Sequence, residues 1–225
     1  MKKWLLALFI TFGSFAFVFA SDAPDIKALQ EKAEKGDAVA QNSLGVCYND
    51  GTGVAQNESE AIKWWHAAAE QGEQHAQCNL GLYYKNIIGG KAGDAEAVKW
   101  FCKAADQGNA EAQLRLGFCY QQGRGVAQDY TEAVKWWRMA ADQGETDAQH
   151  FLGFAYEKGE GVPQDYAEAY KWFILECSYS SMPTLPSPGK TALDSLKTKM
   201  SPQQIADGMS RSYEWLQAKT NNLNK

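Results

Sequence analysis

The nonapeptide WWHAAAEQG at residues 64–72 decides the fold of this chain, because it returns as WFCKAADQG at 100–108 and as WWRMAADQG at 136–144. A second phrase keeps the same step of 36 residues. It reads AQNSLGVCY from Ala40, AQCNLGLYY from Ala76, AQLRLGFCY from Ala112 and AQHFLGFAY from Ala148. Four tandem copies at this period predict a stacked repeat protein. Such chains work by presenting an extended surface to a partner.

Each copy predicts two helices separated by a short loop. In the third copy, apolar and small residues recur with helical spacing over 112–120, and Gly123 begins a run that breaks the helix. Asp129, with Glu132 three residues later, predicts the start of a second helix, because this pair can form a capping box. Gly144 ends that helix, since glycine takes the left-handed cap without strain. We therefore expect an all-α fold, an α-solenoid of four 36-residue helix-turn-helix repeats with an N-terminal half-repeat and a C-terminal helical cap.

The segments on either side of the repeats predict caps. Residues 25–35 align with 61–71 but carry fewer aromatic side chains, as a capping helix should. Residues 181–188 hold three prolines and predict a loop, and two further helices are expected at 191–200 and 202–219. The expected divisions are a signal peptide at 1–20, an N-terminal capping helix at 21–36, repeats at 37–72, 73–108, 109–144 and 145–180, and a Pro-rich loop with C-terminal capping helices at 181–225.

The second copy departs from the others at its loop. Where the other copies carry GTGVAQN, GRGVAQD or GVPQD, it reads NIIGGKAG over 86–93. Ile87 replaces the first glycine of the loop and Gly90 replaces the valine, so this loop must take a different path. Ile87 and Ile88 are then either tucked beneath the loop or offered to a partner, and both alternatives stay open.

The N-terminus predicts an export signal. Lys2 and Lys3 precede an almost wholly apolar run over 4–19, and VFA at 18–20 offers small residues at the −3 and −1 positions of a cleavage site. We expect cleavage after Ala20, with the mature protein periplasmic or secreted and not inserted in a membrane. The alternative is a retained anchor, since the run is nearly long enough to span a bilayer.

Removing the signal peptide, with Lys2 and Lys3, changes the formal net charge from −5 to −7. An acidic chain without a basic run argues against nucleic acid as a ligand.

The cysteines leave their pairing open, because an export compartment permits disulfides. The five are Cys47, Cys78, Cys102, Cys119 and Cys177. Cys47 and Cys119 occupy equivalent positions two repeats apart, too far for a bridge. A bridge between Cys78 and Cys102 is conceivable, beside the alternative that the cysteines are buried thiols acting as small apolar residues. No histidine and cysteine spacing fits a metal site, and we expect no cofactor.

The combined pattern A-Q-x-x-L-G-x-x-Y, G-x-G-V-x-x-D and A-x-x-W-W/F-x-x-A-A-x-Q-G, over about residues 26–177, strongly resembles the Sel-one-like repeat family. This resemblance implies a relative of the tetratricopeptide repeat, with paired antiparallel helices stacked into a right-handed superhelix. It also implies an adaptor that holds other proteins. One exported, cysteine-rich branch of the family has been linked to binding and hydrolysing β-lactams, which is the alternative function. Only Cys177 matches the cysteine pattern of that branch, so its disulfide ladder is not carried over.

A search for catalytic groups finds one weak match. Ser187 and Lys190 have the S-x-x-K spacing of serine β-lactamases, but Pro188 and Gly189 place them in the expected Pro-rich loop, and neither S-D-N nor K-T-G follows. His66 lies on an expected second helix, and His75 and His150 are about two repeats apart, too far for a shared metal or a triad. We therefore expect a protein that is not an enzyme.

In tetratricopeptide-like stacks the first helix of each pair lines the concave side, and this placement gives a candidate binding face. One repeated position forms an apolar row with polar neighbours, occupied by Val46, Leu82, Phe118 and Phe154. Such a strip suits a peptide or helix of a protein partner, although the row could instead pack against the next helix as core. The candidate partner-binding residues are Val46, His75, Leu82, Lys85, Leu114, Phe118, Gln121, His150, Phe154 and Glu157. We expect a monomeric scaffold for an unknown protein or peptide, with a purely structural spacer as a further alternative.

Overall fold

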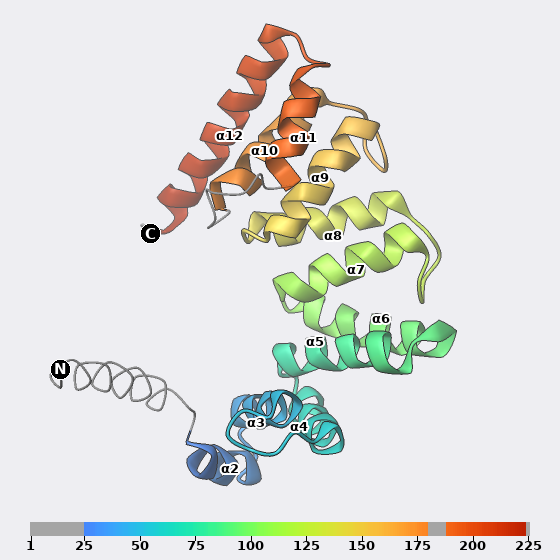
Figure 1. Cartoon of the computed structure of the whole chain (residues 1–225), viewed down its shortest axis with the longest axis vertical. Helices are drawn as coiled ribbons and strands as arrows, with labels where there is room; N and C mark the ends of the chain where they lie inside the picture. The colour runs from blue at the N-terminus through green and yellow to red at the C-terminus, as the bar shows by residue number, and fades with distance from the viewer. Residues whose placement is uncertain (1–24, 180–187, 224–225) are drawn as a thin grey trace, which may run out of the picture. The chain divides into compact units, whose positions relative to one another are not determined.

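The computed structural model describes residues 25–179 and 188–223, which form helices and turns without a strand (Figure 1). The helices are α2 (Ile26–Glu34), α3 (Ala38–Asp50), α4 (Glu58–Glu70), α5 (Gln74–Tyr83), the π-helical turn η1 (Tyr84–Ile88), α6 (Gly90–Asp106), α7 (Ala110–Gln122), α8 (Tyr130–Asp142), α9 (Thr146–Lys158), α10 (Tyr166–Tyr179), α11 (Pro188–Lys197) and α12 (Pro202–Leu223). The expected all-α repeat fold is confirmed. Within these residues, no helix is both long and apolar enough to cross a membrane. The expected signal peptide at 1–20 and the Pro-rich residues 181–187 lie outside the described residues.

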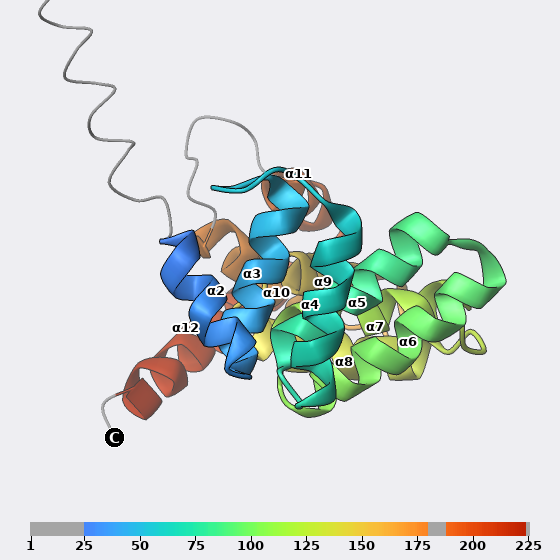
Figure 2. The same ribbon diagram turned by 90° about the horizontal axis from the view of Figure 1, so that it is seen from below.

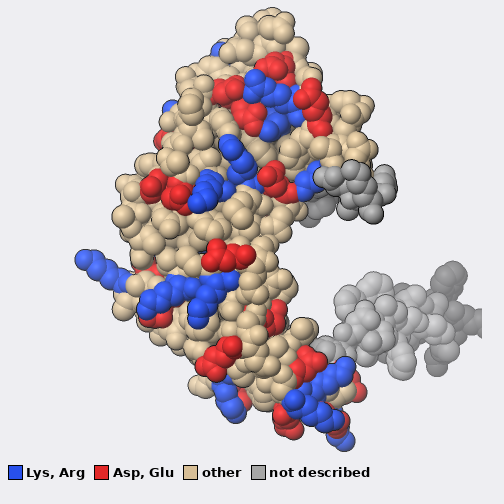
Figure 3. Space-filling model, turned by 180° about the vertical axis from the view of Figure 1, so that it is seen from behind, with Lys and Arg blue, Asp and Glu red and all other residues tan. Residues whose placement is uncertain are grey.

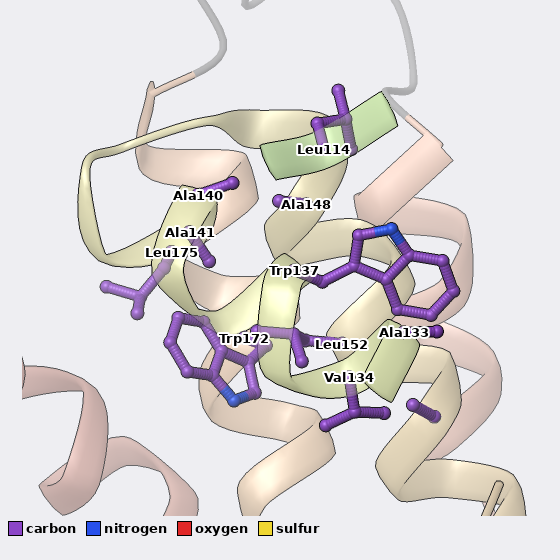
Figure 4. Packing of buried hydrophobic residues seen from close by; sticks show 11 residues of the cluster. Leu114, Ala133, Val134, Trp137, Ala140, Ala141, Ala148, Leu152, Trp172 and Leu175 are labelled. Carbon is purple, nitrogen blue, oxygen red and sulfur yellow. The ribbon is translucent and has the colours of Figure 1, made fainter. Parts of the chain in front are cut away.

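The chain divides into two compact units, Met1–Leu80 and Gly81–Lys225. In the first unit, α2 and α3 bury Ala33 and Leu44 between them, and α3 pairs with α4. In the second unit, α7 pairs with α8 and α9 pairs with α10 (Figure 1), and Figure 2 shows the same chain from below, with α6 in front of α7 and α8. The main core cluster of the second unit draws on all four of these helices (Figure 4). Its largest members are Leu114, Trp137, Leu152, Trp172 and Leu175.

A close contact between glycine and an aromatic ring holds the two helices of every repeat together. The glycine of the L-G pair in the first helix lies against the second residue of the W-W/F pair in the second helix. The four contacts are Gly45–Trp65, Gly81–Phe101, Gly117–Trp137 and Gly153–Phe173. A Cβ at Gly45 would lie 2.5 Å from Trp65 Cδ1, well inside van der Waals contact, so only glycine lets the helices approach this closely.

A buried glutamine joins each repeat to the helix before it. The glutamine of the A-Q pair donates its Nε2–H to an alanine carbonyl eight residues earlier, at 3.0 to 3.4 Å. The donors are Gln41, Gln77, Gln113 and Gln149. Because these side chains are buried, leaving one of the amides unpaired would cost about 1–3 kcal/mol. The recurring glutamine is therefore structural.

Repeat 2 lacks the loop that the other three repeats share. In those repeats a glycine in the left-handed conformation follows the first helix: Gly51, Gly123 and Gly159. Ile87 stands at the equivalent place, and among the residues described only glycines have positive φ. The helix therefore runs on from α5 through η1, and the chain turns at Gly89, with φ of 58°. Ile87 and Ile88 are 61% and 53% exposed, which excludes the alternative that they are tucked beneath a loop.

The C-terminal cap begins earlier than expected. Helix α11 starts at Pro188, so the prediction that residues 188–190 belong to a loop was wrong. Proline suits the first turn of a helix, where an N–H would have no partner, and its presence alone did not mark a loop. Helix α12 packs against α10, where the Trp215 and Trp172 rings lie 6.2 Å apart. Trp215 also donates its Nε1–H to Asp142 at 3.2 Å, which fixes the cap to the end of α8.

An ion-pair network reinforces the same junction. Arg211 Nη1 of α12 lies 2.8 Å from Asp165 Oδ2 and 3.2 Å from Glu168 Oε2, both at the start of α10. Burial opposes ionisation of Asp165, but hydrogen bonds from Arg211 and from the backbone of Glu168 outweigh it and hold the pKa of Asp165 below its ordinary value. Asp165 is thus a charged acceptor with both of its oxygens in use.

Candidate partner-binding face

The predicted apolar row is half-buried in the second unit. Phe118 of α7 meets Phe151 and Trp137 edge to face, with ring centroids 4.6 and 5.7 Å apart. Phe154 of α9 lies 5.3 Å from Phe173 in the same manner. Each ring therefore contributes one side to the core and keeps another side partly accessible. Part of the row is therefore core, and a groove on its accessible side stays a prediction.

An aromatic pocket of about 160 Å³ lies next to this row. Its lining residues are Gln121, Tyr130, Trp137, Phe151, Phe154, Ala155, Lys158 and Glu160. Lys158 stands at the rim, with its Nζ 5.7 Å from the Phe154 ring centroid and 4.0 Å from Glu160 Oε1. Small-molecule sites usually occupy about 300–1,000 Å³, so this volume suits one inserted side chain better than a whole ligand.

Of the pocket residues, Gln121 and Phe154 were predicted from the sequence and the others were missed. Phe151 had a usable signal. It occupies a variable position of the repeat that holds Ser43, Asn79 and Arg115 in the other copies. A large apolar side chain at a position that is otherwise polar indicates either an added core contact or a binding surface.

Three predicted residues are engaged within the protein. Leu114 is 1% exposed and belongs to the core cluster in Figure 4, so its assignment to the binding face was wrong. It shares this cluster with side chains of α8, α9 and α10, which spacing along α7 does not reveal. His150 Nδ1 lies 2.8 Å from Glu176 Oε2, and Glu157 forms an ion pair with Lys199 at 2.7 Å.

The remaining predicted residues are distributed over the two units. In the first unit, Val46 is 37% exposed and the His75 side chain is 63% exposed, with its Nδ1 2.8 Å from Glu73. In the second unit, Leu82 and Lys85 are half-buried at the junction of α5 and η1. These four residues do not line the aromatic pocket.

A group of acidic side chains lies at the N-terminal ends of α7 and α9, away from the aromatic pocket. Its members are Glu111, Glu145 and Asp147. Glu145 precedes α9 without capping it, unlike Asn109, which accepts from Ala112 N before α7. Burial raises the pKa of Glu145, and the carboxylates of Glu111 and Asp147 raise it further. On the face shown in Figure 3, acidic and basic side chains lie beside one another.

The described residues bear on the metal, disulfide and S-x-x-K patterns considered in the sequence. No three potential metal ligands come together in residues 25–179 and 188–223. Cys102 and Cys119 are free thiols, so the conceivable bridge from Cys78 to Cys102 is not formed, and burial raises the pKa of Cys119 to about 11. Lys190 lies in the first turn of α11 and not in a loop, whereas Ser187 lies outside the described residues.

Comparison with known proteins identifies the family. The model of the Sel1 repeat matches residues 38–73, 74–109, 110–145 and 146–175, more than half of the chain. The chain belongs to the Sel1 repeat family. The Sel1 resemblance drawn from the sequence is thus confirmed. No curated protein matches the chain.

Solved structures show the same architecture. The antigen c5321 of uropathogenic Escherichia coli, described as a protective antigen with an SLR fold, is 34% identical over 85% of this chain, with a TM-score of 0.78. This chain covers 40% of the length of c5321. A Sel1 repeat protein from Oxalobacter formigenes is 32% identical, with 85% of this chain and 74% of that chain covered and a TM-score of 0.64. The immunity protein Pa5087 from Pseudomonas aeruginosa is 18% identical, with 91% and 81% covered and a TM-score of 0.51, and shares the fold alone.

Proposed function

We propose that this Sel1 repeat protein is a non-catalytic scaffold that binds a segment of a protein partner, with the aromatic pocket as its anchor point. The pocket carries this proposal because its volume fits one apolar side chain, and because Phe151 and Phe154 keep accessible ring surface at its wall. Burying an aliphatic or aromatic side chain there would contribute about 1.5–3 kcal/mol. In a typical protein interface, a few such anchor residues contribute most of the binding free energy.

The polar rim would orient the partner. Lys158 and Glu160 form an exposed ion pair of the kind that contributes little to stability, so both groups can exchange their contact for a partner without a large penalty. In the acidic group at the other end of the same helices, Arg115 already pairs with Glu111 at 2.6 Å. This pairing leaves Glu145 and Asp147 to favour positive charge on the partner segment. A segment with one apolar anchor and a basic residue fits these two features.

The test fills the aromatic pocket with a larger side chain and creates no cavity in the hydrophobic core. In Gln121→Trp a large side chain at the rim would fill the pocket, whereas Gln122→Trp places the same side chain at an exposed neighbouring position of α7. A photoreactive residue replaces Lys158 in each protein, and the crosslinking is done in cells of the native host. The protein without a tryptophan substitution and the Gln122→Trp variant should both crosslink to a partner. That product should be lost in Gln121→Trp.

Equal crosslinking in both tryptophan variants would exclude the aromatic pocket as the anchor. No crosslinked protein in any background would favour the structural spacer. Hydrolysis of a chromogenic cephalosporin by the purified protein would overturn the non-catalytic part of the proposal and favour the β-lactam alternative.

We also propose that residues 1–20 are a signal peptide and that the mature protein is periplasmic or secreted. Lys2, Lys3, the apolar run and VFA at 18–20 support this. Similarity to c5321, a protective antigen, is in keeping with an exported protein. N-terminal sequencing of the protein from an envelope fraction should begin at Ser21, and cytoplasmic protein with Met1 intact would contradict it.

A further inference from the structure

A second and larger pocket, of about 510 Å³, lies where repeat 4 meets the C-terminal cap. We call it the cap pocket. Its lining residues are Tyr156, Pro163, Gln164, Asp165, Tyr166 and Gln204. None of them lines the aromatic pocket, so the two sites can be tested separately. The volume falls within the range of about 300–1,000 Å³ in which ligand sites usually lie.

The end of the repeat array explains why this pocket is open. The loop of repeat 4 closes over the start of α8, where Gly161 packs against the backbone of Tyr130 and Thr131. Repeat 4 has no following loop of this kind at the start of α10. Helix α12 takes that place instead, and a Cβ at Gly208 would lie 2.8 Å from the carbonyl oxygen of Ala167. The cap thus seals the backbone of α10 while Tyr156 and Tyr166 line an open pocket.

Both tyrosine hydroxyls in the cap pocket have a hydrogen left to donate. Tyr156 Oη accepts from Arg138, and Tyr166 Oη accepts from Gln164 Nε2 at 3.3 Å. The same Gln164 Nε2 donates to the carbonyl oxygen of Glu157 at 2.7 Å, which fixes the orientation of the amide because a carbonyl can only accept. Within the described residues, neither phenol hydrogen has an acceptor. Each is therefore available to a ligand.

Gln204 adds a third donor, and each oxygen of Asp165 already accepts one hydrogen bond. Gln204 Oε1 accepts from Ser201 N at 2.8 Å, so its amide nitrogen is the end left for the pocket. Asp165 Oδ1 accepts from Glu168 N at 3.0 Å and Oδ2 from Arg211 at 2.8 Å. The pocket therefore offers donors from three side chains, beside the apolar faces of two tyrosines and a proline.

We propose that the cap pocket binds an extended, proline-containing segment of a protein. Polyproline II backbone exposes carbonyl acceptors without internal hydrogen bonds, and proline has no N–H that would need an acceptor. Its rings pack against aromatic side chains, as in known proline-rich recognition. A sugar would need acceptors for its hydroxyl hydrogens as well as donors, whereas a proline-containing backbone needs donors alone.

The direct test is calorimetric titration of the purified protein with an acetylated and amidated polyproline peptide of about ten residues. A glycine–serine peptide of equal length, which is flexible and lacks the rings, serves as the reference. We expect saturable binding of polyproline and none of the reference. Binding of chitotriose without binding of polyproline would replace the proposal with a glycan site, and binding of neither probe would overturn it.

Two conservative variants locate the bound peptide. Tyr166→Phe removes one phenol hydrogen but keeps the ring, and Gln204→Glu removes the amide donor but keeps the oxygen that accepts from Ser201. Each should raise the Kd for polyproline roughly two- to tenfold, the effect of one lost hydrogen bond. Tyr213→Phe, on an exposed part of α12, should leave the Kd unchanged. An unchanged Kd in both pocket variants, or weakening by Tyr130→Phe alone, would place the peptide elsewhere and overturn the assignment.

Discussion

Repeats 2 and 3 carry the same two sequence phrases but connect their helices in different ways. In repeat 3, Gly123 ends α7 with φ of 65°, and Asp129 caps α8 by accepting from Thr131 N and Glu132 N at 2.8 and 3.1 Å. In repeat 2 these two places hold Ile87 and Gly93, and the chain forms η1 followed directly by α6. A Cβ at Gly93 would lie 2.5 Å from the carbonyl oxygen of Tyr84, so this glycine lets the start of α6 rest on η1.

The comparison shows which contact both repeats keep and which part of the repeat varies. The contact of Gly81 with Phe101 in repeat 2 matches that of Gly117 with Trp137 in repeat 3. Helix pairing is therefore kept although the connection changes. We infer that the glycine–aromatic contact defines the repeat, and that the glycine and the capping residue of the loop define only the route between its helices.

The largest loss of stability is expected at the glycine–aromatic contact that repeats 2 and 3 share. Gly81→Ala and Gly117→Ala should each lower the free energy of unfolding by about 2–3 kcal/mol, because the added methyl group would overlap a buried ring. Urea denaturation measures both, with Gln122→Ala at an exposed position of α7 as the control. A neutral Gly81→Ala would show that repeat 2 is packed differently after all.

The repeat phrases were sufficient to predict the helices and their pairing, because a fixed period of apolar residues and glycines reports local conformation directly. Leu114 was misassigned because periodicity along α7 shows that a face is apolar, and not which neighbouring helix covers it. The start of α11 was missed because a proline in a first turn looks like a proline in a loop. Both errors concern information held in tertiary contacts.

The two pockets illustrate the same limit. Gln121 and Phe154 follow from the repeated position, but Phe151 enters the aromatic pocket through a departure from the pattern. The cap pocket depends on Gln204, 48 residues after Tyr156 with the end of the repeat array between them. No local motif joins residues so far apart, so only the packing of α12 reveals them.

A smaller loss of stability is expected at Gly123, the left-handed glycine that follows α7 in repeat 3. Gly123→Ala should cost about 1–2 kcal/mol, since a side chain is disfavoured at a φ of 65°. Thermal unfolding of the variant, compared with Gln122→Ala, would show the loss as a lower Tm. If stability were unchanged, the chain would have adopted the route seen in repeat 2, which hydrogen exchange of residues 123–128 could establish.

The cap of α8 should have a smaller contribution still. Asp129→Ala removes the acceptor for two backbone N–H groups and should cost about 1 kcal/mol. Asp129→Asn keeps a capping oxygen and should recover most of that loss. Equal destabilisation by both substitutions would indicate that the charge of Asp129 matters more than its hydrogen bonds.

The smallest effect is expected at the isoleucines that distinguish repeat 2. Ile87 and Ile88 are 61% and 53% exposed, so Ile87→Ser and Ile88→Ser should each change the free energy of unfolding by no more than about 0.5 kcal/mol. Val98→Ser, in the buried face of α6 at 7% exposure, is the matched control and should cost at least about 2 kcal/mol. If either isoleucine variant were as unstable as Val98→Ser, η1 would have to be part of the core and not an exposed substitute for a loop. Neutral isoleucine variants would instead show that the left-handed glycine, and not burial of these side chains, is what separates the two kinds of connection.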